Sequence, residues 1–196
     1  MRKPVCVITG GGSGMGLAAA KEMSKDKIIV LTGRTVKKLE NAVNELTALG
    51  YEAHAFACDV SSWEDVRALA EYAASLGEIR NVIHAAGLSP AMAKPEQLLR
   101  VNALGTGHIN QEFSRLMHAG SVIVDVSSNS AYVLPDFLVG KGLCCLAERD
   151  EEKFVHRLLK LYSLVPGDYR KSGLAYALSK KFVIRYAQMC ASAYGE

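Results

Sequence analysis

The chain has 196 residues, of which 49% are hydrophobic and 22% are charged, and its formal net charge is +3 at pH 7. This length and composition predict one folded domain with a substantial core. The small, scattered positive charge gives no basis for binding nucleic acid or a membrane surface. No apolar run approaches the roughly 18 residues of a membrane span. The apolar run that follows the first four residues has only the length of a strand and is too short for a signal peptide.

The cysteines are odd in number and mostly embedded in apolar runs, without disulfide or zinc spacing. We therefore expect buried thiols in a reducing compartment, and a cytoplasmic protein. His84 and His108 have no second ligand at metal spacing, so we expect packing or capping roles for them and no metal site. The five cysteines are Cys6, Cys58, Cys144, Cys145 and Cys190.

Strand-length apolar runs alternate with helical patterns through the first two thirds of the chain. The predicted strands are residues 5–8, 27–32, 51–57, 81–84 and 121–126. The predicted helices are residues 17–23, residues 35–49, one capped by Ser61 or Ser62, and a long one over 95–118. Unbroken apolar runs suit parallel strands that are covered on both faces. The alternation predicts an α/β fold, a Rossmann-like doubly wound parallel sheet with helices on both faces.

The stretch Thr9–Gly16 is a glycine-rich turn between the first strand and the first helix, which is the context of a dinucleotide-binding motif. Gly10 would permit the tight turn, Gly14 would let the backbone approach a pyrophosphate, and Gly16 would let helix and strand pack closely. A merely flexible turn is the alternative. Ligands of such sheets bind beyond the C-terminal strand ends. The residues expected to converge there are Gly10, Arg34, Asp59, Gly87 and Ser128.

Residues 129–172 interrupt the alternation and are predicted to form a helical insertion. Residues 131–135 and 140–142 are predicted to be loop. An amphipathic helix is expected from Asp150 to Leu164 and should end at Pro166-Gly167, before a last helix over 173–194. The side chains expected on one side of the amphipathic helix are Phe154, Leu158, Leu161 and Tyr162.

Tyr176 and Lys180 are spaced to lie on one face of the last helix, one turn apart. A lysine ammonium near a phenol favours the phenolate, so the tyrosine could act as an acid or base near neutral pH. Such a pair also occurs by chance on solvated helix faces. Its position after a glycine turn, a parallel-sheet pattern and Val126-Ser127-Ser128 favours the catalytic interpretation.

With these residues in order, nearly all of the chain resembles the short-chain dehydrogenase/reductase family. Thr9-Gly10-x-x-x-Gly14-x-Gly16 matches the cofactor turn of its compact members, and His84-Ala85-Ala86-Gly87 matches the segment after strand four. The resemblance implies the catalytic set Asn102, Ser128, Tyr176 and Lys180. It implies a cofactor site formed by Gly10, Gly12, Ser13, Gly14, Met15, Gly16, Arg34, Asp59, Val60, Ala86, Gly87, Tyr176 and Lys180.

The resemblance also implies a role for each catalytic residue. Tyr176 would exchange a proton with the substrate oxygen while the nicotinamide exchanges a hydride with its carbon. Lys180 would favour the phenolate and hold the nicotinamide ribose, and Ser128 would polarise the substrate oxygen. Asn102 would hold a water in a relay to Lys180. Two alternatives stay open: Ser127 in place of Ser128, and Asn102 as a helix-kink residue without a proton role.

The end of the second strand favours NADP over NAD. NAD sites usually place an acid there, which would hold the ribose hydroxyls. This chain has Gly33 and Arg34 instead, and the next carboxylate after them is Glu40. An arginine can stack on adenine and pair with a 2′-phosphate, which an aspartate would repel. Ser13 is not basic, unlike the residue of some NADP-dependent relatives, and a plain surface role for Arg34 is the alternative.

The chain departs from the family in two places. Ser128 and Tyr176 are 48 positions apart, which resembles the enlarged region of the 3α-hydroxysteroid dehydrogenase/carbonyl reductase branch. We expect residues 132–172 to shape the substrate mouth, a subunit contact or both, and deletion would test this by substrate range and oligomeric state. The C-terminal strands of relatives are absent after Glu196, so we expect that a C-terminal segment is missing.

The sequence thus predicts a single domain over 1–196, with an insertion at 129–172. Its expected activity is hydride transfer between NADP and a secondary alcohol or ketone, hydroxysteroid-like, in a homodimer or homotetramer. A dinucleotide-binding sensor or assembly subunit without turnover is the alternative. A sugar-nucleotide epimerase is disfavoured, because the glycine spacing is that of the compact members and the chain is short.

Overall fold

The computed structural model describes residues 2–163 and 166–194. Its contacts divide the chain into two compact units. The first comprises Met1–Ala86 and His108–Val126, and the second comprises Gly87–Gly107 and Ser127–Glu196. The segment 129–172 belongs to the second unit, and the single domain expected over 1–196 stays a prediction.

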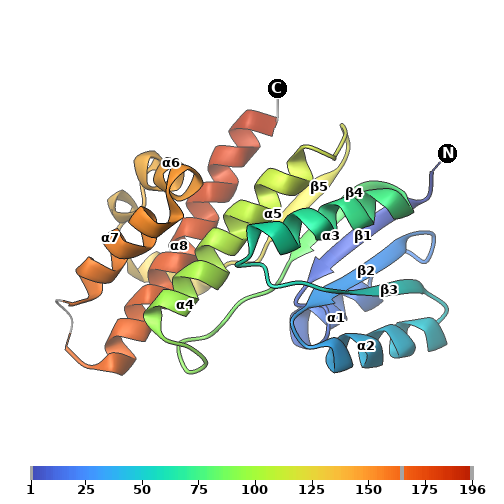
Figure 1. Cartoon of the computed structure of the whole chain (residues 1–196), viewed down its shortest axis with the longest axis horizontal. Coiled ribbons are helices and arrows are strands. Elements are labelled where there is room, and N and C mark those ends of the chain that lie inside the picture. Colours follow the sequence, from blue (N-terminus) through green and yellow to red (C-terminus); the bar gives the residue numbers. More distant parts are fainter. Residues whose placement is uncertain (1, 164–165, 195–196) are drawn as a thin grey trace. The chain divides into compact units, whose positions relative to one another are not determined.

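The first unit is built on a five-stranded parallel sheet, as the apolar runs predict. Its strands are β1 (Pro4–Thr9), β2 (Ile28–Gly33), β3 (Glu52–Ala57), β4 (Glu78–His84) and β5 (Val122–Asp125). The strand order is β3-β2-β1-β4-β5, so the direction of winding reverses beside β1 (Figure 1). Thr9 at the end of β1 pairs with both Thr32 and His84, which aligns the C-terminal ends of three strands. This is the edge at which doubly wound sheets bind ligands.

Helices cover both faces of this sheet. The first three are α1 (Gly14–Lys21), α2 (Val36–Ala48) and α3 (Trp63–Leu76). The apolar faces of α1 and α2 pack on β1 and β2, whereas α3 contacts β1 and β4. Of the two possible capping residues, Ser62 is the N-cap of α3: its hydroxyl accepts a hydrogen bond from the Asp65 amide at 3.2 Å.

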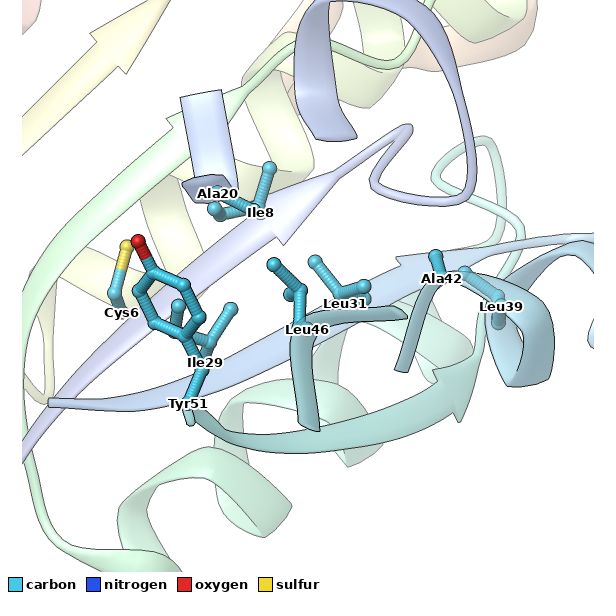
Figure 2. Close-up of a cluster of buried hydrophobic side chains, with 9 residues drawn as sticks. All are labelled: Cys6, Ile8, Ala20, Ile29, Leu31, Leu39, Ala42, Leu46 and Tyr51. Atoms are coloured by element: carbon cyan, nitrogen blue, oxygen red, sulfur yellow. The ribbon is translucent and has the colours of Figure 1, made fainter. Parts of the chain in front are cut away.

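Figure 2 shows the apolar cluster between the sheet and the helices α1 and α2. Ile8 of β1 and Leu31 of β2 project toward Leu46 of α2, and Tyr51 closes the cluster at the start of β3. The Tyr51 hydroxyl donates a hydrogen bond to the Lys21 carbonyl at the end of α1. The apolar side chains of the strands and of the two helices therefore form one continuous cluster. Because this cluster packs α1 against β1, it fixes the turn that joins them.

The prediction of one continuous helix over 95–118 is wrong. The structure has α4 (Pro95–Leu99), a π turn η1 (Arg100–Leu104) and α5 (Gly105–Ser114). The hydroxyl of Thr106, in α5, donates to the Asn102 carbonyl of the π turn at 2.9 Å. Side-chain bonds of Asn102 to the preceding loop stabilise this widened turn, and local sequence periodicity does not report such bonds.

The insertion contains more helix than the sequence predicts. Its elements are η2 (Asn129–Val133) and η3 (Asp136–Leu138), both 3₁₀ turns, then α6 (Lys141–Arg149) and α7 (Glu151–Ser163). The loop expected at 140–142 is wrong, because Gly140 is the N-cap of α6 and the helix is held by buried Cys144 and Ala147. The expected side of α7 is buried except for Leu161, and Leu164 lies outside the described residues.

Helix α8 (Asp168–Tyr194) is the element around which the second unit packs. It begins at Asp168 rather than at 173, directly after Gly167, whose φ of 83° suits glycine. The elements α4, η1, η2, α6 and α7 all contact it. Residues on α8 are therefore fixed from several sides.

All five cysteines are free thiols, and four of them are buried. Burial raises the pKa of the Cys6 and Cys58 thiols to about 12, and that of Cys144 to about 11. These thiols therefore stay protonated at neutral pH. Among the helices of the described residues, none combines the length and apolar character that crossing a membrane requires.

Replacing Leu46 with alanine should remove core packing between α2 and the sheet. Leu46 is fully buried, so we expect the free energy of unfolding to fall by about 2–4 kcal/mol. Leu49→Ala is the matched control, because Leu49 ends the same helix and is 48% exposed. Urea unfolding would measure both, and equal losses would contradict the described core.

Candidate active site

Gly10 and Gly16 show why the turn between β1 and α1 requires glycine. Gly10 has a φ of 67°, in the left-handed region. A Cβ atom on Gly16 would lie 2.5 Å from the Gly10 carbonyl oxygen, closer than non-bonded atoms approach. The start of α1 is therefore pressed directly against the end of β1, as the glycine spacing predicts.

The N-terminus of α1 lies exposed at this turn. Ser13 is its N-cap residue but makes no side-chain capping bond, so the first amides of the helix are not capped by it. Such amides and the helix dipole together favour a phosphate group. Gly14 has a φ of 56° with open space where a Cβ would stand, and Met15 is exposed.

Thr9 joins this turn to the segment after β4, a role that the sequence did not reveal. Its buried hydroxyl accepts a hydrogen bond from the Ala86 amide at 3.0 Å and lies 2.8 Å from Nδ1 of His84. A Cβ on Gly10 would meet the Ala85 and Ala86 backbone at 3.0–3.1 Å. The ends of β1 and β4 are thus in close contact, and His84 has the packing role expected of it.

Asp59 and Val60 follow β3 in a hydrogen-bonded turn. The Asp59 carboxylate accepts bonds from the Ser61 amide and hydroxyl, at 3.0 and 2.7 Å. The Val60 carbonyl accepts a bond from Nδ1 of His108 at 2.9 Å. The His108 ring also packs edge-on against Trp63. His108 therefore anchors the turn, as expected of a packing histidine.

Two cations stand near the ends of β2 and the glycine turn. Arg34 is exposed, and no carboxylate in the described part of the chain pairs with it. A Cβ on Gly12 would lie 3.1 Å from Cβ of Lys38, so this lysine of α2 lies beside the turn. Lys38 is exposed as well. Its position four residues after Arg34, in the first turn of α2, is the signal that could have identified it.

In the second unit, Tyr176 and Lys180 lie one turn apart on α8, as their spacing predicts. Tyr176 is half-buried, and Lys180 is only 6% exposed. A Cβ on Gly87 would lie 3.3 Å from both Nζ of Lys180 and Oδ1 of Asn102. These two side chains therefore both lie beside Gly87, where a larger residue would displace both.

The side-chain amide of Asn102 links three segments. Its Oδ1 accepts a bond from the Leu88 amide at 2.8 Å, and its Nδ2 donates to the Leu88 carbonyl at 3.0 Å. Nδ2 also donates to the Ser179 hydroxyl at 3.2 Å, which in turn donates to the Tyr176 carbonyl at 2.8 Å. Asn102 is thus a residue of a helix distortion that anchors α8. Its place in a water relay stays a prediction.

The structure gives the two neighbouring serines different bonds. The Ser127 hydroxyl donates to the Lys180 carbonyl at 2.7 Å, so its proton is held by α8. The Ser128 hydroxyl accepts a bond from the Ser130 amide at 3.3 Å, as the N-cap of η2. Because η2 packs on α8, both serines lie on segments that contact the helix of Tyr176.

A family model described as short chain dehydrogenase matches residues 4–137. The short-chain dehydrogenase/reductase bsc3 of Alternaria brassicicola is 34% identical over 134 residues, which are 68% of this chain and 48% of that protein. Human carbonyl reductase (NADPH) 1 is 28% identical over 134 residues, 63% of this chain and 48% of its own. The chain thus spans about half the length of these two relatives.

Solved structures resemble the whole chain. An actinorhodin polyketide ketoreductase with NADPH has a TM-score of 0.71 at 18% identity, over 99% of this chain and 66% of its own. A short chain dehydrogenase of Burkholderia cenocepacia in complex with NADP has a TM-score of 0.70 at 22% identity, over 97% of this chain and 68% of its own. At these sequence identities, the similarity to the two structures shows the fold alone.

Replacing Gly16 with alanine should force α1 away from β1, because the new methyl group would overlap the Gly10 carbonyl. We expect unfolding free energy to fall by about 1–3 kcal/mol, together with weaker dinucleotide binding. Gly142→Ala is the control, since its added methyl group meets no atom within 4 Å. Thermal unfolding and NADPH fluorescence titration would measure the effects, and an unaltered Gly16→Ala protein would contradict the close contact.

Proposed function

Because the chain belongs to the short-chain dehydrogenase family, whose members are NAD(P)-dependent oxidoreductases, we propose that it transfers a hydride between NADP and a secondary alcohol or ketone. The observation that carries this proposal is that Lys180, on the helix that also holds Tyr176, is buried and lies with Asn102 beside Gly87. A solvated helix face would leave Lys180 exposed, whereas it is 6% exposed.

The residues of the first unit fit a dinucleotide. The uncapped start of α1 offers amides to a pyrophosphate, and the absence of a side chain at Gly14 leaves room for it. We assign the phosphates to Gly12, Ser13, Met15 and their neighbours in the turn. We assign the adenine to Asp59 and the Val60 backbone, as the family resemblance implies.

A bound nicotinamide supplies or accepts the hydride at the substrate carbon. In ketone reduction, the Tyr176 hydroxyl donates its proton to the substrate oxygen, which becomes the hydroxyl of the alcohol. Lys180 stabilises the phenolate that remains, because an ammonium favours a nearby negative charge. The Ser128 hydroxyl donates a hydrogen bond to the substrate oxygen, where negative charge develops. We prefer Ser128 to Ser127 because the Ser127 hydroxyl donates to the Lys180 carbonyl at 2.7 Å, whereas the bond from the Ser128 hydroxyl to Oδ1 of Asn129 is long, at 3.4 Å.

Arg34 and Lys38 support NADP as the cofactor. A 2′-phosphate would find two cations there, both exposed and, among the described residues, without ion pairs. An unpaired guanidinium can bind phosphate through two hydrogen bonds. Two of the similar solved structures, one with NADPH and one in complex with NADP, support this assignment.

We assign an apolar ketone or alcohol, hydroxysteroid-like, as the substrate class. The insertion exposes Tyr132, Val133 and Phe137 by more than three quarters each, so it offers apolar surface to a substrate or a second subunit. The names of two relatives, a carbonyl reductase and a polyketide ketoreductase, fit a carbonyl substrate. Homodimer or homotetramer formation belongs to the same proposal. The free cysteines fit a cytoplasmic location.

Replacing Tyr176 with phenylalanine should abolish turnover and preserve dinucleotide binding, because only the proton donor is lost. General acid catalysis contributes about 10²–10⁴-fold to the rate, so we expect kcat to fall by at least about 10²-fold. Steady-state kinetics with NADPH and a panel of ketones would measure it. Tyr169→Phe is the control, because Tyr169 lies on the same helix and is exposed.

The same variant separates the enzyme from a sensor. A dinucleotide-binding sensor or assembly subunit would show no turnover in the wild-type chain, and Tyr176→Phe would change nothing. Turnover retained in Tyr176→Phe would contradict the assigned role of the tyrosine.

Replacing Arg34 with alanine should weaken NADPH binding and leave NADH binding nearly unchanged. A hydrogen bond to a charged group contributes about 1.5–3 kcal/mol, so NADPH affinity should fall roughly 10- to 100-fold. Parallel fluorescence titrations would measure both cofactors. Arg67→Ala controls for loss of an exposed arginine in the same unit. Tighter binding of NADH than NADPH by the wild-type chain would overturn the cofactor assignment.

A further inference from the structure

Arg100 makes an unusually complete set of bonds at the start of the π turn η1. Its Nη1 and Nη2 lie 2.8 and 2.9 Å from the two carboxylate oxygens of Glu152. Its Nε donates to Glu96 of α4 at 3.0 Å. The paired contact matches the planar fork of a guanidinium to a carboxylate, which fixes direction as well as distance. Glu152 belongs to α7, so this contact ties the insertion to the π turn.

The exposed fractions of Arg100 and Glu152 indicate how much this ion pair contributes to stability. The Arg100 side chain is 30% exposed and that of Glu152 is 77% exposed. Exposed ion pairs contribute little to overall stability. The hydrogen bonds from Arg100 hold the pKa of the Glu152 carboxyl below its usual value, so Glu152 is ionised at neutral pH. The pair is therefore suited to fixing local geometry rather than to stabilising the fold.

The opposite side of α7 is fixed on α8. Phe154, Leu158 and Tyr162 form a buried stripe at helical spacing. The Phe154 ring packs edge-on against Phe182, with ring centroids 5.3 Å apart. Phe182 follows Lys180 by two residues on α8 and stacks on Tyr186. Helix α7 therefore contacts both the element that carries Asn102 and the element that carries Lys180.

We propose that Arg100 and Glu152 are positioning residues, through which α7 holds the π turn so that Asn102 stays in register with Lys180. This inference rests on the proposed function of Asn102 and Lys180. Arg100 precedes Asn102 by two residues within the same widened turn. Asn102 bonds Leu88 and Ser179, and its Oδ1 and the Nζ of Lys180 both lie beside Gly87. A shift of η1 would change all of these contacts at once.

Glu152→Gln tests the proposal by removing the charge and keeping the shape. We expect kcat to fall by about tenfold, since small misplacements of reacting groups are costly. The NADPH dissociation constant should change by much less than kcat, because the glycine turn and Arg34, which we assign to the phosphates, belong to the first unit. Arg100→Lys should have a similar effect, and the double variant should be no worse than either single variant. Glu71→Gln is the control, since it breaks an exposed ion pair with Arg67.

Hydrogen exchange gives a readout that does not depend on turnover. In Glu152→Gln, the amides of Val101–Leu104 should exchange about tenfold faster than in the wild-type chain, while those of β1 and β2 are unchanged. Unchanged exchange at η1 would overturn the proposal. Faster exchange with unchanged kcat would also overturn it, because the turn would then move without consequence for the reaction. If the wild-type chain lacks turnover and the η1 amides of Glu152→Gln still exchange faster than those of the wild type, the contact between α7 and η1 would be supported and the proposed function contradicted.

Discussion

The Asn102 side chain is 1% exposed and bonds both backbone groups of Leu88 and the hydroxyl of Ser179. A buried polar group that loses its partner costs about 1–3 kcal/mol. The widened turn at η1, the loop after Gly87 and helix α8 must therefore adopt mutually compatible positions. The Asn102 carbonyl also accepts a hydrogen bond from the Thr106 hydroxyl. The arrangement of Tyr176 and Lys180 on the second unit follows from satisfying this one amide.

The segment His84–Gly87 contributes to both units within four residues. Its first residues pack against the glycine turn, since Ala85 and Ala86 lie against Gly10 and the Ala86 amide donates to Thr9. Its last residue, Gly87, lies beside the side chains of Asn102 and Lys180. Small residues are therefore required for two separate reasons: close backbone packing at one end, and space for two polar side chains at the other. The short motif that the sequence shows combines both requirements.

Most of the parallel sheet could be predicted from sequence, because each strand is an apolar run followed by a turn residue. The interruption of the helix at η1 could not, since it depends on bonds between Asn102 and the distant Leu88 and Ser179. Helix α6 was hidden by Gly140 and Gly142, which favour a loop locally, whereas burial of Cys144 holds the helix in the fold. The Ser127-Ser128 pair could be found by motif, but only the structure distinguishes their hydroxyls, by the bond of Ser127 to the Lys180 carbonyl and the capping bond of Ser128.

The distribution of cysteines gives the molecule natural reporters of local opening. Cys6 and Cys58 are buried in the first unit, and Cys144 and Cys190 are buried in the second. A thiol shielded from solvent reacts with an alkylating reagent only when its surroundings open. Cys145 is partly accessible and provides an internal reference for reagent activity. Mass spectrometry of pulse-alkylated peptides can therefore follow the opening of each unit separately in the natural sequence, without an introduced label.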